Sequence, residues 1–347
     1  MNRPPSAGIA GDLGGSRLCA IVARLARVRP VLSVVVAMTM LGAAFDAAEA
    51  AKCKPKRPRP AIVLKSMGAC EFNPETASFK GEPGEQLRCL LRPFDRSRNL
   101  APLLESVPAA LAERAGQTDG LPSREALLTL TSRLNVENDF GTWLWQPLAR
   151  ARDNDPEAPS TRYLMIHDTS GPNFGRRPWP ANIDEHPKIN SLRNFRCSDG
   201  WEVAHVVINR RGDMLLGHEL GEPWRATKFE RAKNFGTTLK GLFLHVELIQ
   251  PRRAMPGRGR RNDALAPTPG FSAAQYDRLA LMYTIASVRA ERWLIPAFHA
   301  PLDAGIRGGH DDPQNFELEA FATSLEALRA RLLRIERKED AVIEAMR

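Results

Sequence analysis

The amino-acid sequence predicts an α/β protein with a mixed central β-sheet flanked by helices, preceded by a mainly helical N-terminal extension. Apolar runs predict strands at 163–167, 202–209 and 242–249. Apolar residues at helical spacing predict covering helices at 272–293 and 317–337. Strands and helices that follow one another in this order indicate an α/β layer.

Local signals support the elements. The strand at 202–209 is followed by Arg211-Gly212-Asp213 and a short apolar segment at 214–216, which together predict a hairpin. The segments 163–167 (YLMIH) and 242–249 (LFLHVELI) are almost wholly apolar, which is typical of buried strands.

The helix starts are marked by capping residues. Ser272 with Gln275 three residues later forms a capping box, and Pro296 is expected to end that helix. In the N-terminal half, residues 61–157 are expected to be mainly helical, with Ser123 as the cap of one helix.

Residues 1–50 have the three parts of a secretory signal peptide. Arginines make the stretch 1–30 basic, residues 31–45 are apolar and uncharged, and Ala48 and Ala50 form a small-residue cleavage site. The apolar run is shorter than the about 20 residues that a membrane-spanning helix needs. We therefore expect cleavage, export to the periplasm or beyond, and no stable membrane span; an uncleaved anchor is the alternative.

The remaining chain divides at a polar, proline-containing segment, 153–159. This predicts an extension at 51–157 and a C-terminal domain at 158–347. The whole chain carries 49 basic and 40 acidic residues, a net charge of +9. Because these charges are scattered and form no basic helix, we expect no nucleic-acid partner, whereas an acidic substrate is compatible with them. The pattern predicts no oligomeric state.

The cysteine count points to disulfides. Cleavage after residue 50 leaves four cysteines, and an even number in an exported protein favours pairing. Cys70 and Cys89 are close in the sequence and are expected to pair, which leaves Cys53 for Cys197. Free buried thiols are the alternative.

All seven histidines lie between positions 167 and 310. His167 ends a predicted strand, His299 follows the apolar run after Pro296, and His310 and Asp312 come a few residues later in a glycine-rich loop. A catalytic zinc needs three histidine or carboxylate ligands and one open position. These side chains provide that set, although a single histidine is more often structural.

Glu247 interrupts an apolar strand, where an ionised group is costly unless it is functional or paired. It is therefore the candidate general base, and a buried salt bridge with an arginine is the alternative. His245 lies on the same strand face, because side chains alternate along a strand. His205 is expected to line the site without binding a metal, and His186 and His218 are expected at the surface.

Five segments resemble, in the same order, the type 2 N-acetylmuramoyl-L-alanine amidases, a zinc family that includes phage lysozyme-type amidases and peptidoglycan recognition proteins. Residues 166–169 (IHDT) correspond to the family's I-H-H-T, and 204–213 (AHVVINRRGD) to A-H-x-x-I-x-R-x-G. Residues 244–248 (LHVEL) correspond to I-G-I-E-L, and 275–279 (QYDRL) to Q-Y-x-x-L. Residues 299–316 correspond to H-x-D-x-x-P-x-R-K-x-D-P-G-P-x-F, in a somewhat longer loop.

The resemblance implies a zinc ion with three protein ligands: His167, His299 and Asp312. It also implies that Glu247 is catalytic, and that His310 stabilises an oxyanion where the family has a lysine. His310 as a ligand in place of Asp312 is the alternative. Asp168 is a departure, since the family has a second histidine there.

The function that this resemblance implies is zinc-dependent hydrolysis of the amide bond between N-acetylmuramic acid and L-alanine in peptidoglycan or muropeptides. Zinc activates water and polarises an amide carbonyl. Arginines in the loops 171–200 and 251–270 suit the carboxylates of such a substrate. The alternatives are a non-catalytic peptidoglycan-binding protein on the same scaffold and a zinc peptidase that cuts another amide of the stem peptide.

Overall fold

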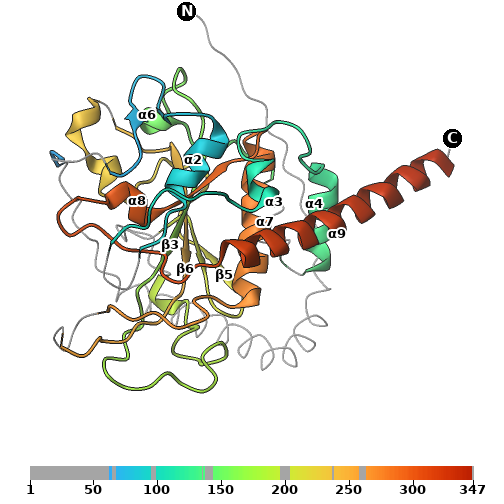
Figure 1. Cartoon of the computed structure of the whole chain (residues 1–347). Coiled ribbons are helices and arrows are strands. Elements are labelled where there is room, and N and C mark those ends of the chain that lie inside the picture. Colours follow the sequence, from blue (N-terminus) through green and yellow to red (C-terminus); the bar gives the residue numbers. More distant parts are fainter. Residues whose placement is uncertain are drawn as a thin grey trace, which may run out of the picture. The chain divides into compact units, whose positions relative to one another are not determined.

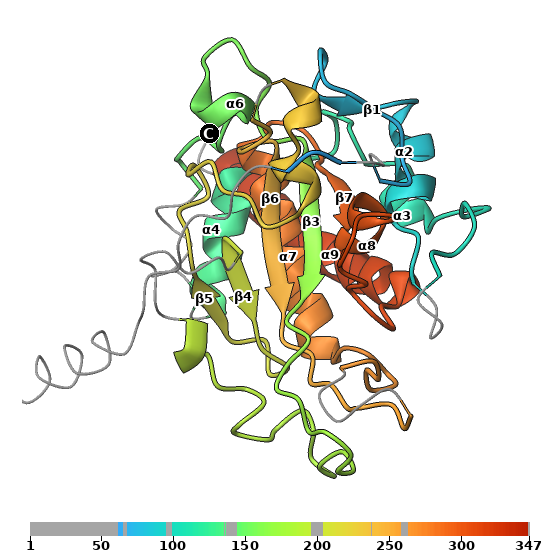
Figure 2. The same ribbon diagram turned by 90° about the vertical axis from the view of Figure 1, so that its left-hand side faces the viewer.

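A five-stranded sheet forms the centre of the molecule in a computed structural model (Figure 2). The strands are β3 (Tyr163–Asp168), β4 (Val206–Ile208), β5 (Met214–Leu216), β6 (Phe243–Leu248) and β7 (Ile295–Phe298). Their order is β5-β4-β6-β3-β7, and only β5 runs antiparallel to its neighbour. The mixed sheet and the β4–β5 hairpin predicted from the sequence are confirmed.

The structure describes most of the chain after the first sixty residues. The described ranges are 62–64, 68–94, 99–134, 136, 144–195, 204–236, 238–257 and 263–345. They all belong to one compact unit, Pro55–Arg347. The predicted signal peptide at 1–50 and the predicted Cys53–Cys197 pair lie outside the described residues.

Two long helices pack against each other beside the sheet, α7 (Ala273–Arg289) and α9 (Leu318–Ala345) (Figure 1). The capping box at the start of α7 is confirmed, because Ser272 Oγ accepts the backbone N–H of Gln275 at 3.2 Å and Gln275 Oε1 accepts that of Ser272 at 3.1 Å. No helix in the described part of the chain combines the length and the apolar character needed to cross a membrane.

The expectation that Pro296 ends the helix after Ser272 is wrong. α7 ends at Arg289, and Pro296 lies inside β7. Proline has no backbone N–H to donate to a neighbouring strand, so it is tolerated in a strand at the edge of a sheet. β7 is such a strand, because it pairs only with β3 among the described strands.

The segment before the sheet contains short elements. These are β1 (Phe72–Asn73), β2 (Ser78–Phe79), α2 (Pro83–Leu90), α3 (Ala109–Ala112), α4 (Arg124–Arg133) and the single turn α6 (Ala151–Asn154). Ser123 Oγ accepts the backbone N–H of Ala126 at 3.1 Å and so caps α4 as predicted. The mainly helical character of 51–157 as a whole stays a prediction, since parts of it lie outside the described residues.

Aromatic side chains close one face of the sheet near the start of its strands. Tyr163 of β3 and Phe243 of β6 stack at 5.3 Å between ring centroids. Phe79 packs on Tyr163 at 5.2 Å and on Phe229 at 5.7 Å. Phe229 belongs to a short helical turn, η3 (Phe229–Arg231), followed by η4 (Lys233–Phe235). This packing fills the face near the strand starts and leaves the other strand ends for polar side chains.

Cys70 and Cys89 form the predicted disulfide, which ties the segment before β1 to α2. The bridge closes a loop of 19 residues, and a loop of that size contributes about 3 kcal/mol in the chain-entropy model. We expect Cys70→Ser/Cys89→Ser to lower the free energy of unfolding by that amount in denaturant titrations. Wild-type protein with reduced cysteines is the control and should lose as much. Free thiols at both positions in a non-reducing peptide map would contradict the pairing.

Candidate metal centre

Three chain segments meet where the parallel strands end (Figure 2). His167 lies one residue from the end of β3 and is in register with Glu247 of β6. His299 follows β7 directly and is the first residue of the short helix α8 (His299–Asp303). Asp312 comes from the loop between α8 and α9. The carboxyl ends of parallel strands are the usual location of ligand sites in α/β sheets.

Three buried side chains converge at this edge: His167, His299 and Asp312. The Nδ1 atoms of the two histidines are 2.9 Å apart. Asp312 lies 3.4 Å from His167 Nδ1 through Oδ2 and 3.2 Å from His299 Nδ1 through Oδ1. Each side chain is only 2% exposed, and the three candidate ligand atoms lie within 4.8 Å of one another. The sequence-predicted ligand set is thus brought together as a group that is able to hold a metal ion.

The nitrogens and oxygens that face away from this centre have their own partners. His299 Nε2 donates to Asp303 Oδ2 at 3.0 Å, and Asp312 Oδ2 accepts the backbone N–H of Asp168 at 3.2 Å. His167 Nε2 lies 3.0 Å from His245 Nδ1. Such partners orient metal-binding side chains and leave their other atom for the ion.

The electrostatics of the three side chains favour a positive charge among them. Burial lowers the pKa of His167 to about 3, so this imidazole is neutral. Burial opposes the charged form of Asp312 as well, yet His299 holds the pKa of that carboxyl well below its ordinary value. Conversely, Asp312 and Asp303 outweigh burial and raise the pKa of His299 well above its ordinary value. A metal ion bound by His299 would replace the proton that Asp312 and Asp303 favour on this imidazole.

Glu247 has a carboxyl group with an unpartnered oxygen and a raised pKa. Its Oε2 is enclosed and has no hydrogen-bond partner. Burial, then the charges of Asp312 and Asp168, raise the pKa of Glu247 well above its ordinary value. Among the residues that the structure describes, no arginine lies within ion-pair distance of it, so the alternative of a buried salt bridge finds no support there.

The centre opens into a polar pocket of about 590 Å³. The lining residues are His167, Arg225, Ala226, Thr227, Lys228, Arg231, Glu247, His299, Asp303 and His310. Three of these are cationic and come from the segment 225–231, before and within η3. The arginines expected to bind substrate lie in the loops 171–200 and 251–270. The segment 225–231 was not predicted to line the site, although its basic residues recur every three positions.

His310 lies at the rim of the site. Its side chain is 54% exposed, its ring stacks on His299 at 4.7 Å, and its Nδ1 is 3.5 Å from Asp312 Oδ1. The buried group is completed by Asp312 and not by His310. The position suits a donor that reaches a ligand in the pocket; its role in catalysis stays a prediction.

Asp168 forms a buried ion pair with Arg252, and both side chains are fully buried. Arg252 Nη2 donates to Asp168 Oδ1 at 2.7 Å, and Asp168 Oδ2 accepts the backbone N–H of Gln314 at 3.0 Å. Gln314 belongs to the loop that carries Asp312. Asp168 therefore anchors the loop that carries the third candidate ligand.

Arg252→Met is expected to destabilise the fold strongly. Removing the guanidinium leaves the Asp168 carboxylate buried without its counter-charge, and breaking such a pair costs about 3–5 kcal/mol. The double variant Asp168→Asn/Arg252→Met strands no charge and should recover part of the loss. Denaturant unfolding measures both. A loss below about 1 kcal/mol in Arg252→Met, which is typical of a surface pair, would show that the buried pair is not needed for stability.

Two other histidine predictions need revision. His205 does not belong to the residues that line the pocket; it lies behind them and accepts the backbone N–H of His245 at its Nδ1, at 3.0 Å. His218 is buried and not at the surface, because its ring stacks on Trp224 with 3.6 Å between centroids.

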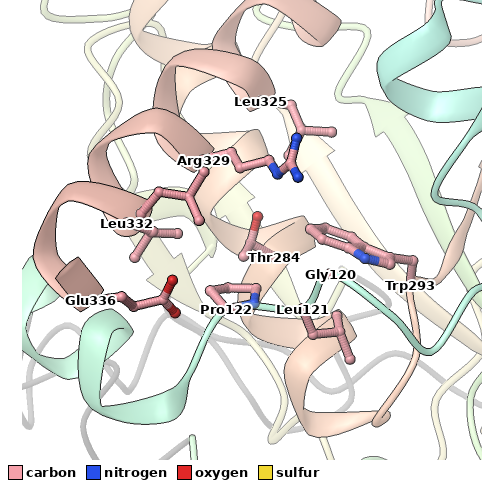
Figure 3. A pocket seen from close by; sticks show the side chains of 10 residues that line it. Gly120, Leu121, Pro122, Thr284, Trp293, Leu325, Arg329, Leu332 and Glu336 are labelled. Carbon is pink, nitrogen blue, oxygen red and sulfur yellow. The ribbon is translucent and has the colours of Figure 1, made fainter. Parts of the chain in front are cut away.

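A second, more apolar pocket lies between α7, α9 and the segment 120–122 (Figure 3).

Comparison with family models, curated proteins and solved structures gave no match. The likeness to the type 2 amidases therefore depends on the five quoted segments alone.

Proposed function

We propose that the protein is a zinc-dependent amidase that hydrolyses the bond between N-acetylmuramic acid and L-alanine in peptidoglycan or muropeptides. The observation that carries this proposal is a buried His167–His299–Asp312 group beside Glu247, which lines the same polar pocket and whose Oε2 is enclosed without a hydrogen-bond partner. We further propose that the chain is exported, as its predicted signal peptide indicates.

The donor set suits zinc better than it suits magnesium or calcium. Two imidazoles and one carboxylate are the ligands of several catalytic zinc sites, which keep a fourth position open. Magnesium and calcium prefer sites made of oxygen ligands. When bound, zinc supplies an activated water and an electrophile for the amide carbonyl.

The chain's own residues account for the proton transfers. In this proposal Glu247 takes a proton from the attacking water and returns it to the leaving amine of L-alanine. His310, at the rim, is placed to donate a hydrogen bond to the oxygen on which negative charge develops. Arg225, Lys228 and Arg231 give the pocket a positive lining, which suits a peptide rich in carboxylates.

Product analysis with a defined muropeptide tests the proposal. The purified protein should release free N-acetylmuramic acid-containing glycan and an intact peptide beginning with L-alanine, as identified by mass spectrometry. A chelator should abolish the reaction and added zinc should restore it. Cleavage at another amide would favour the zinc peptidase, and tight binding to peptidoglycan without any product would favour the non-catalytic binding protein.

A further inference from the structure

Three histidines lie side by side on one face of the sheet. His245 of β6 stands between His167 of β3 and His205, which directly precedes β4. The ring centroids are 5.2 Å apart for His167 and His245 and 5.6 Å apart for His245 and His205. His245 and Glu247 are two residues apart on one strand and project to the same face. His245 is fully buried and does not line the pocket, so it has no direct access to a substrate.

A buried carboxylate contacts the middle histidine of this row. Glu230 Oε1 is 3.3 Å from His245 Nε2, and both side chains are fully buried. The other oxygen of Glu230 is already occupied: Oε2 accepts the backbone N–H groups of Ala226 and Thr227, at 3.1 and 3.0 Å, and the Thr227 hydroxyl at 2.9 Å. These donors hold the carboxylate in place, and they leave Oε1 to accept a hydrogen bond from His245.

The pattern of donors and acceptors fixes the tautomers along the row. A carboxylate oxygen only accepts, so the proton of His245 resides on Nε2 and its Nδ1 is an acceptor. In the neutral imidazole that Nδ1 accepts a hydrogen bond from the Nε2–H of His167, 3.0 Å away. The remaining nitrogen of His167, Nδ1, is then bare and faces His299 and Asp312. A metal ligand must present such a bare nitrogen.

We propose that Glu230 and His245 are positioning residues that hold His167 in the tautomer that binds the metal, with Nε2 protonated and Nδ1 directed into the site. The inference rests on the metal site of the proposed function. It adds a hydrogen-bonded path from Glu230 through His245 to His167, parallel to the single contact that Asp303 makes to His299.

Glu230→Gln tests the path with almost no change in shape. The amide can donate to His245 Nε2, which moves the His245 proton to Nδ1 and turns that atom into a donor toward His167. His167 then carries its proton on Nδ1, where the metal has to bind. Losing such an outer partner typically weakens metal affinity about 10–100-fold. We expect this loss in zinc titrations against a chromophoric chelator, and a switch of the protonated His167 nitrogen in ¹⁵N spectra of histidine-labelled, metal-free protein.

Two further variants separate positioning from simple packing. His245→Leu removes the acceptor and should weaken zinc binding as Glu230→Gln does, whereas His245→Asn keeps an acceptor oxygen near the position of Nδ1 and should retain most of the affinity. Glu222→Gln is the matched control, since Glu222 Oε2 pairs with His218 Nδ1 at 3.1 Å outside the metal site. It should bind zinc like wild type.

The outcomes distinguish this inference from the proposed function. Wild-type zinc affinity in Glu230→Gln and His245→Leu would overturn the positioning role and leave the metal site intact. Equal weakening in His245→Asn and His245→Leu would also overturn it, because packing alone would then explain the effect. Failure of the wild-type protein to bind zinc at all would overturn the metal site of the proposed function and, with it, this inference.

Discussion

His167→Ala is expected to yield folded protein that retains no stoichiometric zinc and no amidase activity, because one of three buried ligands is lost. Asp312→Ala should behave in the same way. The wild-type protein should hold about one zinc per chain, with Zn–N distances near about 2.0–2.1 Å. Metal analysis after dialysis, together with circular dichroism to establish folding, measures the difference. Stoichiometric zinc in His167→Ala would refute the ligand assignment.

His310→Ala provides the matched contrast at the same loop. It removes an exposed imidazole 3.5 Å from Asp312 but leaves the buried group complete. Zinc content should stay at the wild-type level while kcat falls about 10²–10³-fold, the usual effect of losing one preorganised donor. His310→Lys should restore part of the rate. If His310→Ala lost zinc while Asp312→Ala kept it, the third ligand would be His310.

The parts of the fold that the sequence predicted have strong local signals. Every side chain of β3 is buried, as is every side chain of β6 except Glu247, and the capping box of α7 combines two residues at fixed spacing. The candidate ligands were predicted from the order of five segments that resemble a zinc family, whose ligand positions correspond to His167, His299 and Asp312. A local pattern was sufficient for the strands and the helix cap, whereas the ligand set needed the order of the segments along the whole C-terminal half.

Other features depend on contacts between distant segments, and no local pattern reports them. Pro296 disfavours a strand in isolation, and only its place at the sheet edge makes β7 possible. The Asp168–Arg252 pair joins residues 84 positions apart. Glu230 lies in a polar segment that carries no catalytic signal, and its contact with His245 exists only because η3 packs against the sheet.

Glu247→Gln is expected to keep the fold and the zinc but to lose most of the catalytic rate. The amide has the shape of the carboxyl but cannot take a proton from water, and the loss of a general base costs about 10²–10⁴-fold in kcat. Arg252→Met leaves a buried carboxylate without its counter-charge. Glu247→Gln does not leave an arginine unpaired in this way, because Glu247 forms no ion pair with an arginine among the described residues, and its Oε2 has no hydrogen-bond partner to lose. We therefore expect denaturant unfolding at or slightly above the wild-type midpoint.

The pH dependence of kcat in the wild type and in Glu247→Gln is the sharper test of the general base. A carboxyl acts as a base only when it is ionised, so the wild-type rate should rise as the pH rises through the pKa of Glu247. Burial and the charges of Asp312 and Asp168 raise that pKa, and a bound cation would lower it again. Glu247→Gln should lack this acidic limb in a kcat profile measured at saturating zinc. A rate within about tenfold of wild type, with the limb unchanged, would show that another group takes the proton.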